Sequence, residues 1–153
     1  MTKKGVLIVL VMVLPVLFLG WFVMQKTRWN FKNFTIREMR CKCGKCSDDT
    51  GLNMSYSTMK RLQKLRDVCG FPFLISSAYR CSSHPEEAKK VEPGTHNYGH
   101  AIDIQATPPQ MDIIEREAKK LGFTGIGRAN SFIHIDDYAG NARISRPAKW
   151  YYS

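Results

Sequence analysis

Residues 95–104 read Thr-His-Asn-Tyr-Gly-His-Ala-Ile-Asp-Ile, and residues 132–136 read Phe-Ile-His-Ile-Asp. Both stretches end in a short alternation of apolar and polar residues, the pattern of a strand with one face toward the core. In the second stretch the two isoleucines share one face, while His134 and Asp136 share the other. Two such strands, each with a metal-binding side chain facing away from the core, predict a site built across a sheet.

Two histidines and two carboxylates are the candidates for a metal site: His96, Asp103, His134 and Asp136. Asp103 lies on the first strand, and His96 precedes it by seven residues in a turn-like segment that contains glycine. Imidazole and carboxylate groups suit a catalytic zinc site, which has three protein ligands and one position open to water. A single histidine is more often an ordinary hydrogen-bonded residue, so the residues alone leave both interpretations open.

The surrounding sequence predicts an α+β domain with a small mixed or antiparallel sheet and flanking helices. One helix is expected over 57–69, and another begins at the capping sequence 107–110. A capping box at 35–38 predicts a short helical turn, and 82–94 reads as a polar loop. The last two expected strands are paired as a hairpin. Strands are expected over 73–76, 101–104, 123–127 and 132–136.

The N-terminal part of the chain is expected to be a transmembrane anchor. Residues 5–24 form a run of twenty uncharged, mostly apolar residues, which is long enough to cross a hydrocarbon core. A cleaved signal peptide is the alternative, although the run is long for one and lacks a small-x-small cleavage pattern. We therefore expect an anchor or signal peptide over 1–25, a linker over 26–33 and a folded domain over 34–153.

Charge and cysteine content bear on location and partners. The net charge is +10, and all basic residues except Lys3 and Lys4 lie beyond residue 25. Such a surface suits anionic cell-wall polymers or lipid headgroups, or serves only solubility. The five cysteines follow the apolar run, and their density suits an oxidising compartment. The domain is therefore expected in the periplasm or outside the cell, where nucleic acid is not an expected partner.

The cysteines allow two interpretations. Cys41-x-Cys43-x-x-Cys46 together with Cys69 has the spacing of a structural zinc knuckle. Disulfides are favoured in an oxidising compartment, and Cys69 with Cys81 is one expected pair because the helix and the strand end should pack together. The odd count leaves at least one thiol unpaired within the chain.

Three blocks of the sequence resemble a known enzyme family. Residues 94–104 resemble the S-x-H-x-x-G-x-A-x-D-[IL] motif of the D-alanyl-D-alanine carboxypeptidase-like zinc peptidases, with Thr95 beside the usual serine position. Residues 75–81, Ile-Ser-Ser-Ala-Tyr-Arg-Cys, are similar to the family's upstream strand, and 132–136 to its closing strand. The family includes peptidoglycan endopeptidases and phage endolysins, and the hedgehog signalling domain shares its fold.

The resemblance implies a zinc peptidase that hydrolyses amide bonds in peptidoglycan stem peptides or cross-links. Such an enzyme is a carboxypeptidase or an endopeptidase, and a phage lysin is one possible setting. It also implies that Arg80 binds a substrate carboxylate or the developing oxyanion. The two further histidines, His84 and His100, are not expected to be ligands. The implied Zn²⁺ ligands are His96, Asp103 and His134.

The general base departs from the family pattern. Many relatives carry a glutamate three residues before the final histidine, or a histidine two before it, where this chain has Ser131 and Phe132. We therefore predict that Asp136, on the same strand face as His134, is the base. The alternative is a carboxylate that only orients a ligand. Two further hypotheses follow: an inactive, metal-containing cell-wall binding module of the same fold, or a cysteine-rich redox or structural membrane protein.

Overall fold

The computed structural model describes residues 29–46 and 51–152 of the chain. Its described helices and strands all belong to one compact unit, Phe31–Ser153. The predicted anchor over 1–25 lies outside the described residues. Within the described ranges, no helix has the length and apolar character needed to cross a bilayer.

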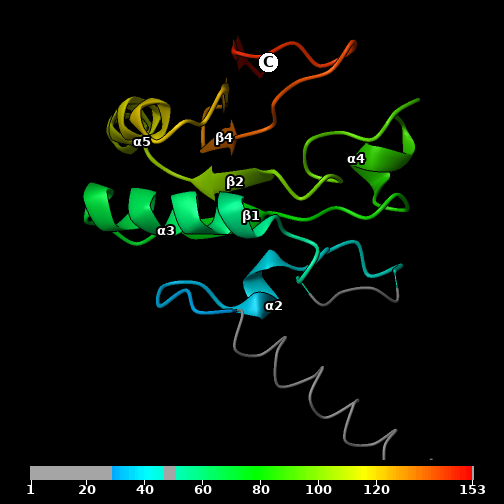
Figure 1. Ribbon diagram of the computed structural model, residues 1–153, viewed down its shortest axis with the longest axis horizontal. Coiled ribbons are helices and arrows are strands. Elements are labelled where there is room, and N and C mark those ends of the chain that lie inside the picture. Colours follow the sequence, from blue (N-terminus) through cyan, green and yellow to red (C-terminus); the bar gives the residue numbers. More distant parts are fainter. Residues whose placement is uncertain (1–28, 47–50, 153) are drawn as a thin grey trace, which may run out of the picture. The chain divides into compact units, whose positions relative to one another are not determined.

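A five-stranded mixed sheet forms the centre of this unit (Figure 1). Its strand order is β1-β2-β4-β3-β5, and all neighbours are antiparallel except β3 and β5, which are parallel. The predicted α+β class, mixed sheet and closing hairpin of β3 and β4 are therefore confirmed. The strands are β1 (Leu74–Ser77), β2 (Ala101–Gln105), β3 (Gly125–Arg128), β4 (Phe132–Asp136) and β5 (Ala148–Tyr151).

The main helices form where the sequence carries capping signals. α2 (Ile36–Met39) and α5 (Pro108–Lys120) both begin with the predicted capping boxes, in which the first side chain and the one three residues later satisfy backbone N–H groups. α3 (Tyr56–Cys69) ends at Gly70, whose φ of 74° is the left-handed conformation that closes a helix.

Two short elements lie where no regular structure was predicted. α4 (Pro85–Ala88) is a single turn within the expected polar loop, and His84 begins it by accepting a hydrogen bond from the backbone of Glu86 at 3.1 Å. β5 lies at the sheet edge beside β3. Its parallel pairing depends on a strand distant in the sequence, so no local pattern predicts it.

The apolar side of the sheet is covered by helices. α5 packs against β4, and α3 packs beside α5. The isoleucines of β2 and β4 are fully buried, in agreement with the predicted strand alternation. Burying each such side chain stabilises the fold by about 1.5–3 kcal/mol. Helix residues that complete this core are Met59, Leu62, Leu65, Met111, Ile114 and Ala118.

Candidate metal centre

Two neighbouring strands bring two of the three predicted ligands opposite each other. β2 and β4 are antiparallel, and Asp103 pairs directly with His134 in their register. Directly opposed residues point to the same face of a sheet. His134 Nδ1 consequently lies 2.8 Å from Asp103 Oδ1, on the face away from the core isoleucines.

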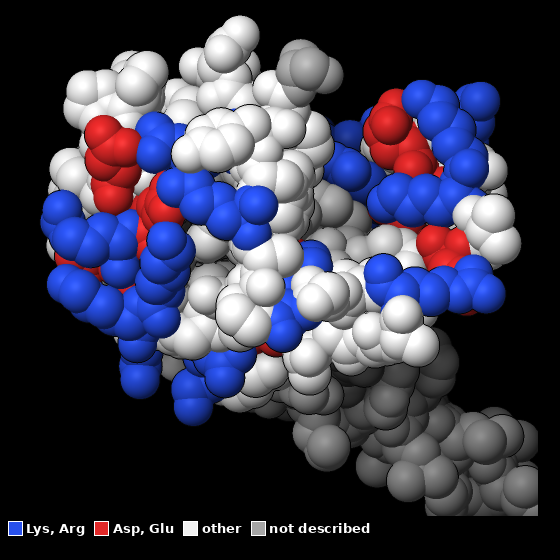
Figure 2. Space-filling model, turned by 90° about the horizontal axis from the view of Figure 1, so that it is seen from above, with Lys and Arg blue, Asp and Glu red and all other residues white. Residues whose placement is uncertain are grey.

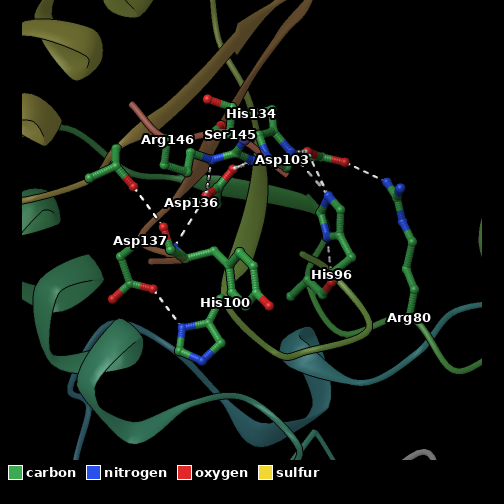
Figure 3. A network of polar contacts seen from close by, with 12 residues as sticks. Arg80, His96, His100, Asp103, His134, Asp136, Asp137, Ser145 and Arg146 are labelled. Carbon is green, nitrogen blue, oxygen red and sulfur yellow. Dashed lines mark hydrogen bonds and ion pairs between the residues drawn. The ribbon is translucent and has the colours of Figure 1, made fainter. Parts of the chain in front are cut away.

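The third predicted ligand, His96, reaches the same point from a turn. The turn ends at Gly99, whose φ is 73° and where a Cβ atom would collide with neighbouring backbone, so the position requires glycine. His96 Nε2 lies 3.1 Å from both Asp103 Oδ1 and His134 Nδ1 (Figure 3). The structure thus brings all three predicted ligands together, and all three are buried.

Hydrogen bonds on the outer sides of the two imidazoles fix the positions of their protons. His96 Nδ1 donates to the carbonyl oxygen of Ala78 at 2.6 Å, because a carbonyl only accepts. His134 Nε2 donates to the Asp136 carboxylate at 3.1 Å for the same reason. The two remaining nitrogens therefore direct lone pairs toward the Asp103 oxygen. Three acceptors that face one another require a positive charge between them, either a proton or a metal ion.

The spacing of these donor atoms fits zinc. Imidazole nitrogen and carboxylate oxygen bind Zn²⁺ at about 2.0–2.2 Å, which in a tetrahedral arrangement separates the donors by roughly 3.3–3.6 Å. The three donors lie 2.8–3.1 Å apart, slightly closer than a bound ion would hold them. Two nitrogens and one carboxylate oxygen also match the ligand count of catalytic zinc. The residues present therefore fit the ion.

Surrounding groups set the charges that the ligands need. Burial alone would raise the pKa of Asp103, but His96 and His134 hold it far below its usual range. Burial lowers the pKa of His96. Burial would also lower the pKa of His134, but hydrogen bonds to Asp103 and Asp136 outweigh it and raise this pKa. A proton on His134 Nδ1 occupies the position that a metal ion would take, so an ion bound there would displace it.

Arg80, predicted to bind a substrate carboxylate or oxyanion, contacts a ligand. Its Nη2 donates to Asp103 Oδ2 at 2.5 Å, and its Nε donates to Ser77 Oγ at 2.8 Å. A bulge in β1 before Ser77 shifts the register with β2, as bulges often do near active sites. Arg80 also lines the groove over the ligands. Its guanidinium therefore fixes Asp103 and stays within reach of a bound molecule.

Asp136, predicted as the general base, lies on the far side of His134 from the other ligands. Its Oδ2 contacts His134 Nε2, the nitrogen directed away from the metal position. Its carboxylate also accepts two hydrogen bonds from Arg146, at 2.8 and 2.5 Å, and one from the backbone of Tyr138 at 3.2 Å. The side chain is fully buried. This position favours the alternative role, a carboxylate that orients a ligand.

Comparison with known families agrees with this geometry. The family described as Peptidase M15 matches residues 32–136, more than half of the chain. The chain belongs to the M15 peptidase family. The predicted relationship to D-alanyl-D-alanine carboxypeptidase-like zinc peptidases is therefore confirmed, and the matched range contains all three predicted ligands. No curated protein matches the chain.

A groove of about 550 Å³ opens over His96 and His134 of this M15 domain. The Trp150 ring forms part of its wall and lies 5.2 Å from the His134 ring. The Arg146 guanidinium lies 5.4 Å from the centre of the Trp150 ring. Sequence reasoning missed Arg146, Trp150 and Tyr152. The two aromatic residues stand two positions apart, and this strand spacing is a signal that could have identified them.

Two glycines of β3 make room for these groups in the M15 domain. A Cβ atom on Gly125 would overlap the Asp136 carboxylate, and one on Gly127 would come within 2.6 Å of the Trp150 ring. Glycine within a strand commonly marks such a close approach. Both positions therefore belong to the site although neither has a side chain.

The two histidines predicted not to be ligands have other contacts. His100 Nδ1 lies 2.9 Å from Asp137 Oδ1 and 3.2 Å from Thr58 Oγ1, and these contacts connect α3 to the end of β4. His84 begins α4. Neither belongs to the group of potential ligands around His96.

The expected disulfides are not formed. No disulfide joins any of the five cysteines. Cys81 does not pair with Cys69, and its sulfur lies 3.6 Å from those of Cys41 and Cys43. The reason is the course of the chain after β1, which a backbone hydrogen bond from Tyr79 joins to the end of α2 rather than to the end of α3.

Proposed function

We propose that the chain is a zinc-dependent peptidase that hydrolyses amide bonds in peptidoglycan stem peptides or cross-links. One observation carries the proposal: lone pairs of His96, Asp103 and His134 converge beneath a groove in a chain of the M15 family. Zinc bound at such a site lowers the pKa of a coordinated water toward about 7 and polarises the scissile carbonyl.

The residues around the ligands keep the site in one arrangement. Asp136 and the Ala78 carbonyl each hold the outer N–H of one imidazole, and Arg80 holds the second oxygen of Asp103. Such outer contacts orient ligands and raise their basicity. Arg80 is also the group proposed to meet a substrate carboxylate or the developing oxyanion, because its forked donors suit both.

Arginine side chains at the groove are suited to a substrate that carries a carboxylate. Arg80, Arg143 and Arg146 line it, and each forms an ion pair with a carboxylate of the chain: Asp103, Glu92 and Asp136 respectively. Figure 2 shows lysine and arginine side chains in two groups on this face, one on the α5 side and one on the α4 side. Peptidoglycan stems end in carboxylates, and their attraction to such a surface raises the rate of encounter.

The test is digestion of purified peptidoglycan followed by mass spectrometry of the released muropeptides. The wild-type chain should release products with new amino and carboxyl termini, and His134→Ala should be at least about a hundredfold slower because one metal ligand is lost. His84→Ala is the matched control, since that histidine only begins α4. Equal rates for wild type and His134→Ala would refute the proposal, and the product masses identify the bond that is cut.

A second candidate is a catalytically inactive binding module of the same fold. The observation that favours it is the engagement of both Asp136 oxygens by Arg146 and Tyr138, which leaves the predicted base occupied. This candidate predicts that the zinc-loaded chain sediments with peptidoglycan but releases no termini. The binding module is excluded if the wild-type chain releases more new termini from peptidoglycan than His134→Ala does.

We also propose that the domain acts on the outer side of the membrane, where its substrate lies. The supporting observation is the apolar run over 5–24, which belongs to the residues outside the described ranges. Proteolysis of intact spheroplasts should degrade the domain. Full protection until lysis would contradict this location.

A further inference from the structure

Four cysteines from two separate segments meet at one point. Cys41, Cys43 and Cys46 follow α2, whereas Cys81 follows β1, and all four sulfur atoms lie within 4.8 Å of one another. Cys41 and Cys81 are buried, and the other two are half-buried. Cys69, at the end of α3, is not part of this four-cysteine cluster.

The sulfur spacing is that of a metal site rather than of two disulfides. Cys43 Sγ lies 3.5 Å from that of Cys46 and 3.6 Å from that of Cys81, and Cys41 Sγ lies 3.6 Å from that of Cys81. A disulfide joins two sulfurs at about 2.05 Å and pairs each with one partner. Here Cys43 is equally near to two sulfurs. Four thiolates bound to tetrahedral zinc at about 2.3 Å stand about 3.8 Å apart, close to the observed spacing.

The backbone around the cluster directs donors at its sulfurs. Gly44, between two cysteines, has a φ of 67°, and in this turn the backbone N–H of Lys45 donates to Cys43 Sγ at 3.3 Å. The backbone N–H of Cys81 donates to Cys41 Sγ at 3.4 Å. Hydrogen bonds of this kind stabilise the negative charge of thiolates, the form that binds metal.

We propose that the four-cysteine cluster binds a structural Zn²⁺ ion that is separate from the peptidase metal. Four thiolates leave no open position, so this ion stabilises the fold and does not take part in hydrolysis. It joins the segment after α2 to the chain after β1. Such an ion contributes directly to folding, because the unfolded chain has no preformed site.

The cluster is connected to the peptidase site through the residue next to Cys81. Arg80 contacts Asp103 with its side chain, its backbone N–H donates to His96 O at 3.3 Å, and its carbonyl accepts from Asn97 at 2.7 Å. An ion that fixes Cys81 therefore also fixes the loop on which Arg80 approaches the ligands. Arg80 gains a defined position without any direct contact between the two metals.

Metal content tests the proposal in the full chain, purified in mild detergent without chelator. Wild type should hold about two zinc ions per chain, and His96→Ala and Cys43→Ser about one each. Cobalt substitution distinguishes the sites, because only thiolate ligands give an intense sulfur-to-cobalt charge-transfer band in the near ultraviolet. The band should persist in His96→Ala and disappear in Cys43→Ser.

Two further variants distinguish loss of the cysteine site from loss of folding. Cys69→Ser, outside the cluster, should keep both ions and the cobalt band. Cys43→His supplies a different zinc ligand at the same position and should restore the second ion that Cys43→Ser loses. The proposal is overturned if wild type and His96→Ala lack the cobalt band, if Cys43→Ser binds as much zinc as wild type, or if mass spectrometry finds these cysteines paired as disulfides. None of these outcomes depends on peptidase activity.

Discussion

At the scale of single residues, the side chains of the candidate metal centre are held by residues that contact them from outside. Asp136 determines which nitrogen of His134 carries the proton, and the Ala78 carbonyl does the same for His96. Strand alternation predicted that His134 and Asp136 share a face. It could not predict the second partner of Asp136, because Arg146 arrives from the loop before β5. That contact is what favours an orienting role over the role of base.

Replacing Asp136 by asparagine should therefore weaken zinc binding. The loss of the carboxylate from His134 Nε2 is expected to reduce zinc affinity about 10- to 100-fold, measured by competition with a chelating dye. Asp112→Asn, a change at an exposed carboxylate on α5, is the control and should leave affinity unchanged. If Asp136→Asn keeps wild-type zinc affinity but loses hydrolysis, Asp136 is the base.

The close approach of Trp150 to Gly127 leads to a second prediction. Gly127→Ala should destabilise the domain by about 1–3 kcal/mol, because the new methyl group overlaps the indole ring. In a Trp150→Ala background the same change should lower the free energy of unfolding much less. Urea unfolding of wild type, the two single variants and the double variant measures the difference. An equal loss of unfolding free energy in both backgrounds would show that the destabilisation does not come from overlap with the Trp150 ring.

At the scale of elements, local sequence signals predicted where helices and strands form, but not which elements pack against one another. The capping boxes at Thr35 and Thr107 and the terminator Gly70 act within one turn, so they could be read directly. The pairing of β5 beside β3 could not be read, because it depends on contacts made across the sheet. For the same reason the sequence did not reveal that Cys81 meets Cys41 instead of Cys69.

An ionic network on α5 holds the edge strand in place. Glu115 Oε1 accepts hydrogen bonds from Lys119 and from Lys149 of β5, both at 2.7 Å, and Oε2 lies 3.3 Å from Arg128 of β3. Burial alone would raise the pKa of Glu115, but the two lysines lower it to about 2. Because the folded pKa lies below the unfolded value, this stabilisation is complete above about pH 5 and is lost as the pH falls toward 2.

Glu115→Gln should accordingly lower the free energy of unfolding by about 1–2 kcal/mol at pH 7. The difference from wild type should shrink as the pH falls from 5 to 3, measured by urea unfolding at each pH. Glu86→Gln, which removes an exposed ion pair with Lys89, should have an effect of less than about 0.5 kcal/mol. A difference for Glu115→Gln that stays constant with pH would contradict this account.

At the scale of the whole molecule, the arrangement of the cysteines no longer supports an oxidising location for the domain. Their density suggested an oxidising compartment, because disulfides were the expected use of so many thiols. In the structure four of them form one cluster and no disulfide joins them. The proposal of an outward-facing domain now depends on the apolar N-terminal run and on the family's substrate, and no longer on the cysteines.

The dependence of hydrolysis on a metal at His96, Asp103 and His134 is the most direct test of the proposed zinc peptidase. Zinc is removed from the full chain with a chelator and returned in steps, while the release of termini from peptidoglycan and the zinc content are measured together. The zinc bound by His134→Ala in the same titration is subtracted, because the proposed cysteine site also binds zinc. Cys69→Ser, a change outside both proposed metal sites, is the control and should behave like wild type. We predict that the rate is negligible without metal and rises in proportion to occupancy of this site. The proposal would be contradicted if the rate of hydrolysis did not change with zinc occupancy. It would also be contradicted if His134→Ala hydrolysed peptidoglycan as fast as wild type.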